Sequence, residues 1–165
     1  MVYKLYGLTP EEIAIVEGKQ YMYYFAYGSN MSHIQMHKRC PGSKFISKAN
    51  LKGYEFVYDG YSETRKHAVG NIVKSPGCVV WGGLFEITEE CIKRLDECEG
   101  YLKKKYDRMR IGVEDDTGQI HDAIVYFRIG KKIGKPSDEY RKIVIEGARN
   151  CGIDEDYIQN YLRGN

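Results

Sequence analysis

The sequence predicts an α+β domain in which helices flank a small, mixed, barrel-like sheet. Segments with strand character dominate the middle of the chain. One helix is expected after the first strand, one after the fourth strand and two at the end, which is not the regular alternation of a parallel α/β fold. The length of 165 residues, with 42% hydrophobic and 29% charged side chains, is typical of one ordinary globular domain.

Residues 1–20 are expected to form a helical appendage to a domain that spans residues 21–165. The run Thr9-Pro10-Glu11-Glu12 combines an N-cap hydroxyl, proline at the first helical position and glutamate three residues after the cap. Gly18 is placed to stop this short helix.

The domain is expected to begin with a strand over 21–27, a turn, and a helix over about 31–39. The strand is rich in aromatic residues, which favour pleated structure, and Gly28 breaks it. Either Ser29 or Asn30 can cap the helix that follows.

Three further strands are expected, over 51–58, 68–73 and 79–87. A helix should follow them, capped by Thr88 and ended by Gly100 in a left-handed turn. Its apolar stripe is expected to consist of Cys91, Ile92, Leu95 and Cys98.

The C-terminal part is expected to form a hairpin and two helices. The hairpin strands cover 108–113 and 119–128, because the residues 115–118 between them, Asp-Asp-Thr-Gly, are typical of a tight turn. Pro136-Ser137 should start the next helix, and Asp154 should cap the last one.

Composition argues against several classes of partner. The 25 basic and 23 acidic side chains leave a net charge of +2, too balanced for a nucleic-acid footprint, so no nucleic-acid partner is expected. No segment approaches the roughly 20 apolar residues that span a membrane. Five widely spaced cysteines without a signal peptide favour reduced thiols and a cytoplasmic location.

The turn after the first strand is the first candidate for chemistry. A strand that turns through Gly28 into a helix start leaves several backbone N–H groups unpaired, and such a nest binds carboxylates or oxyanions. By physics alone, a plain strand-to-helix turn is at least as good an interpretation.

The acidic end of the helix before Gly100 is the second candidate. Asp96, Glu97 and Glu99 lie where the negative end of the helix dipole raises the pKa of a carboxyl group, which suits proton transfer near neutral pH. A solvated acidic helix end is the alternative, and it is the more common one.

Other reactive side chains carry weaker signals. His33 and His37 are one helical turn apart, but no third ligand follows at a zinc-site spacing, so no metal is expected. Cys98 stands beside carboxylates that disfavour its thiolate. The basic run 103–105 is either a phosphate patch or, more simply, a solvated loop.

Several motifs, taken together and in this order, resemble the gamma-glutamylcyclotransferase family. Tyr-Phe-Ala-Tyr-Gly-Ser-Asn at 24–30 is similar to the family's hallmark, and the acidic helix end at 95–100 is similar to its Glu-Gly element. Ser-Pro-Gly at 75–77, followed by Val-Trp-Gly at 80–82, and Pro-Ser-x-x-Tyr at 136–140 also match. The resemblance covers about residues 23–162.

This resemblance implies a small mixed barrel and a reaction that needs neither metal nor cofactor. The implied substrate is a small molecule with a gamma-glutamyl group, whose own α-amine attacks the γ-carbonyl, so that 5-oxoproline forms and the attached amine departs. It implies Glu99 as the general acid/base. The substrate-binding residues that it implies are Tyr24, Phe25, Ala26, Tyr27, Gly28, Ser29, Asn30, Tyr106, Tyr126 and Tyr140.

Three questions stay open at this point. The substrate class is one, because Tyr101 and the basic run 103–105 depart from the loop of some family members, next to the expected exit of the leaving group. The assembly is another, with a homodimer as one option. A non-catalytic module that binds a small molecule or a partner is the alternative function, since a fold does not fix an activity.

Overall fold

The computed structural model describes residues 7–9, 12–13, 18, 20–62, 66–129 and 133–164. Five strands form a closed barrel in the order β1-β3-β2-β4-β5, in which β1 and β5 are parallel and the other neighbours antiparallel. The strands are β1 (Tyr21–Ala26), β2 (Lys44–Ser62), β3 (His67–Thr88), β4 (Tyr106–Asp115) and β5 (Ile120–Arg128). The predicted mixed barrel is thereby confirmed.

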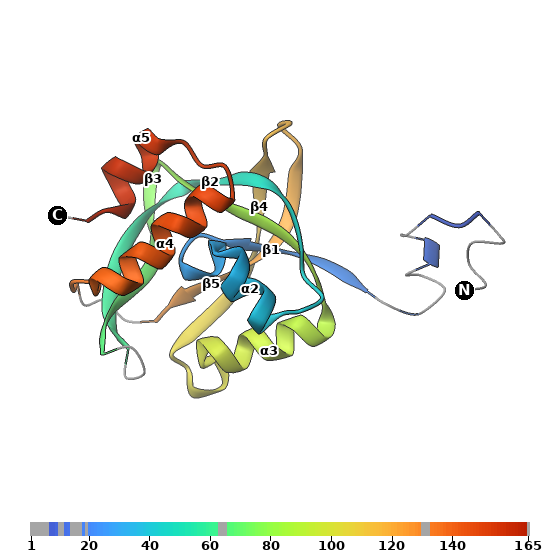
Figure 1. Ribbon diagram of the computed structural model, residues 1–165, viewed down its shortest axis with the longest axis horizontal. Helices are drawn as coiled ribbons and strands as arrows, with labels where there is room; N and C mark the ends of the chain where they lie inside the picture. Colours follow the sequence, from blue (N-terminus) through green and yellow to red (C-terminus); the bar gives the residue numbers. More distant parts are fainter. Residues whose placement is uncertain are drawn as a thin grey trace.

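Helices flank the barrel, as Figure 1 shows. The α-helices are α2 (His33–Arg39), α3 (Glu89–Glu99), α4 (Asp138–Asn150) and α5 (Glu155–Tyr157). Two short 3₁₀ turns, η2 (Ser29–Met31) and η3 (Tyr101–Lys103), precede α2 and follow α3, and a π-helical turn, η4 (Ile158–Leu162), continues α5. No helix of the described residues is long and apolar enough to cross a bilayer.

The expected N-terminal capping box is present in the part of residues 1–20 that the structure describes. The backbone N–H of Thr9 donates to Glu12 Oε2 (2.8 Å), and the N–H of Glu12 donates to Thr9 Oγ1 (3.2 Å). Residues 1–6, 10–11, 14–17 and 19 lie outside the described residues. The division into an appendage and a domain therefore stays a prediction.

The expectation of three separate strands between 51 and 87 is wrong. β2 and β3 form one long hairpin, and β3 runs through Pro76 without a break. Lys52 pairs with Val79 but Tyr54 pairs with Lys74, so a bulge absorbs the extra residues of β3. Gly77 (φ 86°) adopts the left-handed backbone that this bulge requires, and the bulge accommodates a proline that cannot donate to a ladder.

Helix α3 begins and ends where its caps predict. Thr88 Oγ1 accepts from the backbone N–H of Cys91 (3.3 Å), and Gly100 adopts φ 67° beyond the last turn. The predicted stripe is right for its first three members, which are buried, but Cys98 is exposed. The reason is that the last turn of α3 borders a cavity instead of the core.

The hairpin between β4 and β5 is held by one carboxylate. Asp115 Oδ1 accepts from the N–H and the hydroxyl of Thr117 (2.9 and 2.7 Å) and from the N–H of Gln119 (3.0 Å). Asp115 Oδ2 lies 2.7 Å from His121 Nε2. The hydrogen bonds from Thr117 and His121 hold the pKa of Asp115 well below its usual range.

We expect Asp115→Asn to lower the melting temperature by roughly 2–4 °C at neutral pH. Because the folded-state pKa is depressed, the carboxylate stabilises the fold fully above its unfolded pKa of about 4, and this stability is lost as the pH falls further. The difference from wild type should therefore shrink in acid. Thermal melts at neutral and acidic pH measure it, with Asp116→Asn in the same exposed turn as the control. Equal melting temperatures for the two variants at neutral pH would show that the hydrogen bonds of Asp115 do not contribute to the stability of the fold.

Candidate active site

A cavity of about 510 Å³ lies where the end of α3 faces the turn after β1. Parts of α2, β2, β3, η3, β4, β5 and α4 complete its wall. All but two of the predicted site residues line it: Glu99, Tyr24, Tyr27, Gly28, Ser29, Asn30, Tyr106, Tyr126 and Tyr140. The turn and the acidic helix end, which lie far apart in the sequence, thus share one cavity.

Phe25 and Ala26, the other two predicted site residues, do not line this cavity. Both side chains are buried in the core, with exposed fractions of 0% and 1%. Successive residues of a strand point to opposite faces, so Phe25 faces away from Tyr24 and packs where Gly82 leaves space for its ring. Ala26 is too small to reach the cavity.

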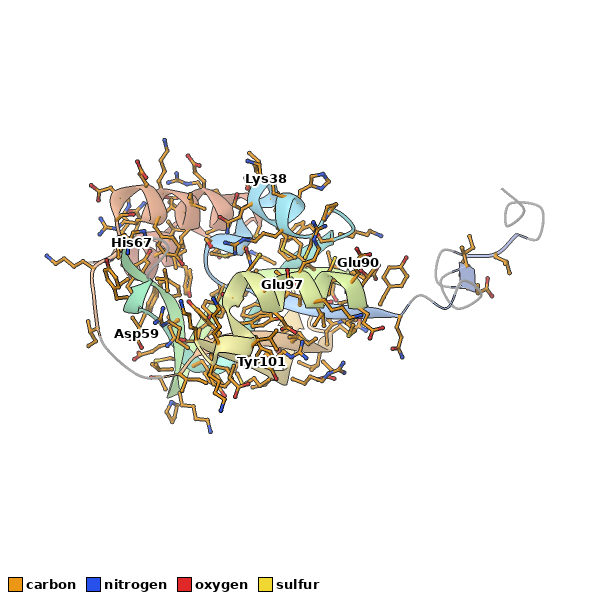
Figure 2. The ribbon with its side chains drawn as sticks, turned by 90° about the horizontal axis from the view of Figure 1, so that it is seen from below. Lys38, Asp59, His67, Glu90, Glu97 and Tyr101 are labelled. Carbon is orange, nitrogen blue, oxygen red and sulfur yellow. The ribbon has the colours of Figure 1, made fainter. Side chains whose placement is uncertain are left out.

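Glu99 is the last residue of α3, and its carboxylate reaches the turn. Glu99 Oε1 accepts a hydrogen bond from Asn30 Nδ2 (3.4 Å) and lies 3.9 Å from Arg39 Nη1. The side chain of Glu99 is 17% exposed and lines the cavity. Figure 2 shows this helix end, with Glu97 labelled on α3 and Tyr101 directly after it.

Asn30 organises the turn through its buried carboxamide. Its Oδ1 accepts from Gln35 Nε2 (3.0 Å) and Arg39 Nη1 (2.8 Å), and its Nδ2 donates to Tyr24 OH (2.9 Å) as well as to Glu99. These contacts use both lone pairs and both protons of the amide. Because its bonding capacity is filled, Asn30 holds α2, β1 and Glu99 in one arrangement.

Arg39 is a site residue that the sequence pattern did not reveal. It is the last residue of α2, where a cation ordinarily complements the negative end of the helix dipole. The sequence therefore indicates only this electrostatic role at the helix end. The contacts of Arg39 with Asn30 and Glu99 are evident only in the fold.

The backbone of the turn presents unpaired donors at the cavity wall. Among the described residues, no acceptor bonds to the N–H groups of Gly28, Ser29 and Asn30, although the N–H groups of Met31 and Ser32 bond back to this turn. Tyr140 lies close to Gly28, since a Cβ there would be 3.5 Å from the Tyr140 hydroxyl. The turn therefore offers a carboxylate or an oxyanion several N–H donors.

The phenols around Glu99 remain protonated at working pH. Burial raises the pKa of Tyr24 and of Tyr106 far above the usual range, and the negative charge of Glu99 raises both further. Burial also raises the pKa of Tyr27, whose hydroxyl donates to the carbonyl of Tyr126 (2.6 Å). Tyr24 and Tyr106 are therefore neutral hydrogen-bonding groups beside the carboxylate.

Asp96 ties the last turns of α3 to the barrel. Its carboxylate accepts from Tyr126 OH (2.6 Å) and from Arg108 Nη1 (3.1 Å). The guanidinium of Arg108 also lies 4.8 Å from the centre of the Tyr101 ring. Since Asp96 precedes Glu99 by one helical turn, these contacts set the position of the cavity acid.

Comparison with known proteins decides the family. Residues 79–161 match the model of the AIG2-like family. The mouse protein named gamma-glutamylcyclotransferase is 30% identical over 145 residues, which cover 86% of this chain and 77% of the mouse protein.

The chain belongs to the gamma-glutamylcyclotransferase family of enzymes.

Other gamma-glutamylcyclotransferase relatives agree with this assignment. The human protein of that name is 29% identical over 138 residues, covering 81% of this chain and 73% of the human one. A solved structure titled gamma-glutamyl cyclotransferase superposes with a TM-score of 0.83 at 27% identity, over 88% of this chain and 90% of that one. The resemblance inferred from the motifs is confirmed, and so is the fold that it implies.

Proposed function

We propose that this protein is a gamma-glutamylcyclotransferase that releases 5-oxoproline from a small gamma-glutamyl substrate, with Glu99 as the general acid/base. One observation carries the proposal: the carboxylate of Glu99 lies in the same cavity as the unpaired amides of the turn and is bonded to Asn30 of that turn. An acid beside an anion site fits the α-ammonium and the α-carboxylate, which a glutamyl group carries on one carbon.

Substrate binding begins with the α-carboxylate of the glutamyl group. The N–H groups of Gly28, Ser29 and Asn30 would bind it, in the way that unpaired amides at a helix start bind anions. The α-ammonium would then lie next to Glu99. This arrangement folds the glutamyl chain so that its amine faces its own γ-carbonyl, which removes much of the entropic barrier to ring closure.

Ring closure needs proton transfers and no enzyme nucleophile. Glu99 takes one proton from the α-ammonium, and the amine attacks the γ-carbonyl carbon, so that a C–N bond and a tetrahedral oxyanion form. Glu99 returns this proton to the leaving nitrogen, the oxyanion collapses, and the bond to that nitrogen breaks. The second proton of the ring nitrogen also passes to the departing amine, which leaves as an ammonium ion, so that the ring nitrogen becomes the lactam N–H. The products are 5-oxoproline and the free amine.

Neutral phenols support the charged intermediate. Tyr24 and Tyr106 line the cavity and keep their protons, so they can donate to an oxygen on which negative charge develops. Removal of one such donor in other acyl-transfer enzymes costs about 3–4 kcal/mol of transition-state stabilisation.

A cytoplasmic location is part of the proposal. The cysteines at 40, 78, 91, 98 and 151 are all free thiols. Unpaired thiols are typical of a reducing compartment.

The alternative, a non-catalytic binding module on the same fold, is not favoured. A binding module needs no acid at the junction between the anion site and the rest of the cavity, yet Glu99 stands there with its orientation fixed by Asn30 and Arg39.

Incubation of the purified protein with a panel of gamma-glutamyl peptides and gamma-glutamyl amines tests the proposal. We expect 5-oxoproline and the free amine to appear in equal amounts for at least one substrate, as measured by mass spectrometry. If substrates of the panel bind but none of them forms the lactam, the proposal is contradicted. The non-catalytic binding module would then be the better interpretation.

A further inference from the structure

A group of three cations lines the cavity beyond Glu99. Lys103 ends η3, Lys105 precedes β4, and Arg128 ends β5. In the part of the chain that the structure describes, no carboxylate forms an ion pair with any of the three. We call these three residues the basic wall.

The acids of the cavity do not neutralise the basic wall. Asp96 is paired with Arg108 at 3.1 Å, and Glu99 faces Arg39 and Asn30. Glu97 also lines the cavity, but its side chain is exposed. The basic wall therefore keeps an excess of positive charge.

Arg128 is held in place by neutral groups. Its guanidinium lies over the ring of Tyr106, 5.4 Å from the ring centre, and its Nη2 donates to the carbonyl of Tyr61 (3.4 Å). Gly60 makes room for it, because a Cβ there would lie 2.7 Å from the guanidinium atoms. Its Nε is buried and has no partner among the described residues. The fold thus fixes a cation at the cavity without giving it a counter-ion.

The basic wall lies next to Glu99 and is built from different elements than the anion-binding turn. The side chain of Lys105 packs over Gly100, with its Cδ 3.2 Å from the position that a Cβ of Gly100 would take. Tyr106 lies close to both Glu99 and Arg128. In addition to burial, the charge of Glu99 raises the pKa of the Tyr106 phenol, and the charge of Arg128, which lies over its ring, lowers it. The turn that would hold the glutamyl α-carboxylate comes instead from β1 and η2. The leaving amine, which takes its proton from Glu99, is therefore the part of the substrate that faces the basic wall.

We propose that the cavity selects gamma-glutamyl substrates whose leaving amine is a dicarboxylic amino acid or an acidic peptide, with its carboxylates bound at Lys103, Lys105 and Arg128. This inference rests on the proposed function. An alkylamine would leave all three cations without a counter-ion, and an amino acid with one carboxylate would pair with one of them. A leaving group with two carboxylates pairs with two, and the planar guanidinium of Arg128 suits a carboxylate in two-point contact.

The test compares three substrates whose leaving groups carry no, one and two carboxylates: gamma-glutamyl-ethylamine, gamma-glutamyl-alanine and gamma-glutamyl-glutamate. We expect kcat/KM for 5-oxoproline release to rise about tenfold with each carboxylate, so that the glutamate substrate exceeds the ethylamine substrate about 100-fold. High salt should narrow this ratio, because it screens exposed charges.

Variants locate the effect on the basic wall. The double variant Lys103→Gln/Lys105→Gln should lower the ratio between the glutamate and ethylamine substrates about tenfold. The control Lys74→Gln/Lys142→Gln changes the net charge equally, and both of its lysines are exposed and lie outside the cavity lining, so it should keep the wild-type ratio.

The outcomes separate this inference from the proposed function. If 5-oxoproline forms but the ethylamine substrate is used as well as the glutamate substrate, the preference for an acidic leaving group is overturned and the proposed function stands. Equal ratios for the two double variants would likewise overturn the preference and leave the proposed function intact. If none of the three substrates yields 5-oxoproline, the proposed function falls and this inference falls with it.

Discussion

Glu99→Gln is expected to lower kcat for 5-oxoproline release by about 10²–10⁴-fold, the usual contribution of a general acid/base. Glutamine has the size of glutamate and its Oε1 can still accept from Asn30 Nδ2, so the cavity should keep its shape. It cannot take a proton from the α-ammonium or return one to the leaving nitrogen. Initial rates at saturating substrate measure the effect, and an unchanged melting temperature shows that the fold is intact.

Glu97→Gln is the matched control for that experiment. Glu97 stands two residues earlier on α3 and lines the same cavity, but its carboxylate forms no hydrogen bond or ion pair with any described residue. The same chemical change should alter kcat only a few-fold there. A wild-type kcat in Glu99→Gln, or a loss of kcat in Glu97→Gln as large as that in Glu99→Gln, would contradict the role of Glu99 as the general acid/base.

Gly147→Ala is expected to have the second largest effect, on both stability and activity. Gly147 of α4 packs against the backbone that follows η2: an added Cβ would lie 2.4 Å from the nitrogen of Ser32 and 2.7 Å from the carbonyl carbon of Met31. Backbone cannot move aside as a side chain can, so the overpacking should cost about 1–3 kcal/mol or more of the free energy of unfolding. The melting temperature should fall by roughly 2–4 °C for each kcal/mol.

The loss of activity in Gly147→Ala should exceed what the loss of stability explains. The displaced backbone directly follows the amides of Gly28, Ser29 and Asn30, and a shift of about 1 Å in a positioning group can cost 10²-fold in rate. Gly42→Ala is the control, because no described atom lies within 4 Å of a Cβ at that position. A Gly147→Ala protein with the melting temperature and rate of Gly42→Ala would show that α4 does not hold the turn.

The sequence predicts best the parts of the fold whose cues are local. Helix α3 lies between Thr88 and Gly100, and both act within one turn of the helix. The long hairpin of β2 and β3 was not predicted, because Pro76 and Gly77 are typical of the end of a strand when the partner strand is not known. The partner strand β2 pairs with β3 on both sides of them, and Gly53 (φ 83°) stands in β2 at this bulge.

The motifs indicate where the candidate site lies, but not which contacts build it. The resemblance singled out Glu99 and the turn, and the barrel brings both to one cavity. It also included Phe25, because a motif read along a strand does not separate the face that lines a cavity from the face that fills the core, and Ala26, whose small side chain is buried in the core. Arg39 was not predicted because its contact with Glu99 depends on how α2 and α3 pack, and Arg128 because its place opposite Tyr106 depends on the register of β4 and β5.

The fate of the γ-carbonyl in isotopic water is the most direct test of the central claim, that the substrate's own amine is the nucleophile. A cleavage carried out in H₂¹⁸O should yield 5-oxoproline without ¹⁸O, because no water oxygen enters the ring. Free glutamate with one ¹⁸O in its γ-carboxylate would mean that water attacks instead, and that outcome would contradict the account.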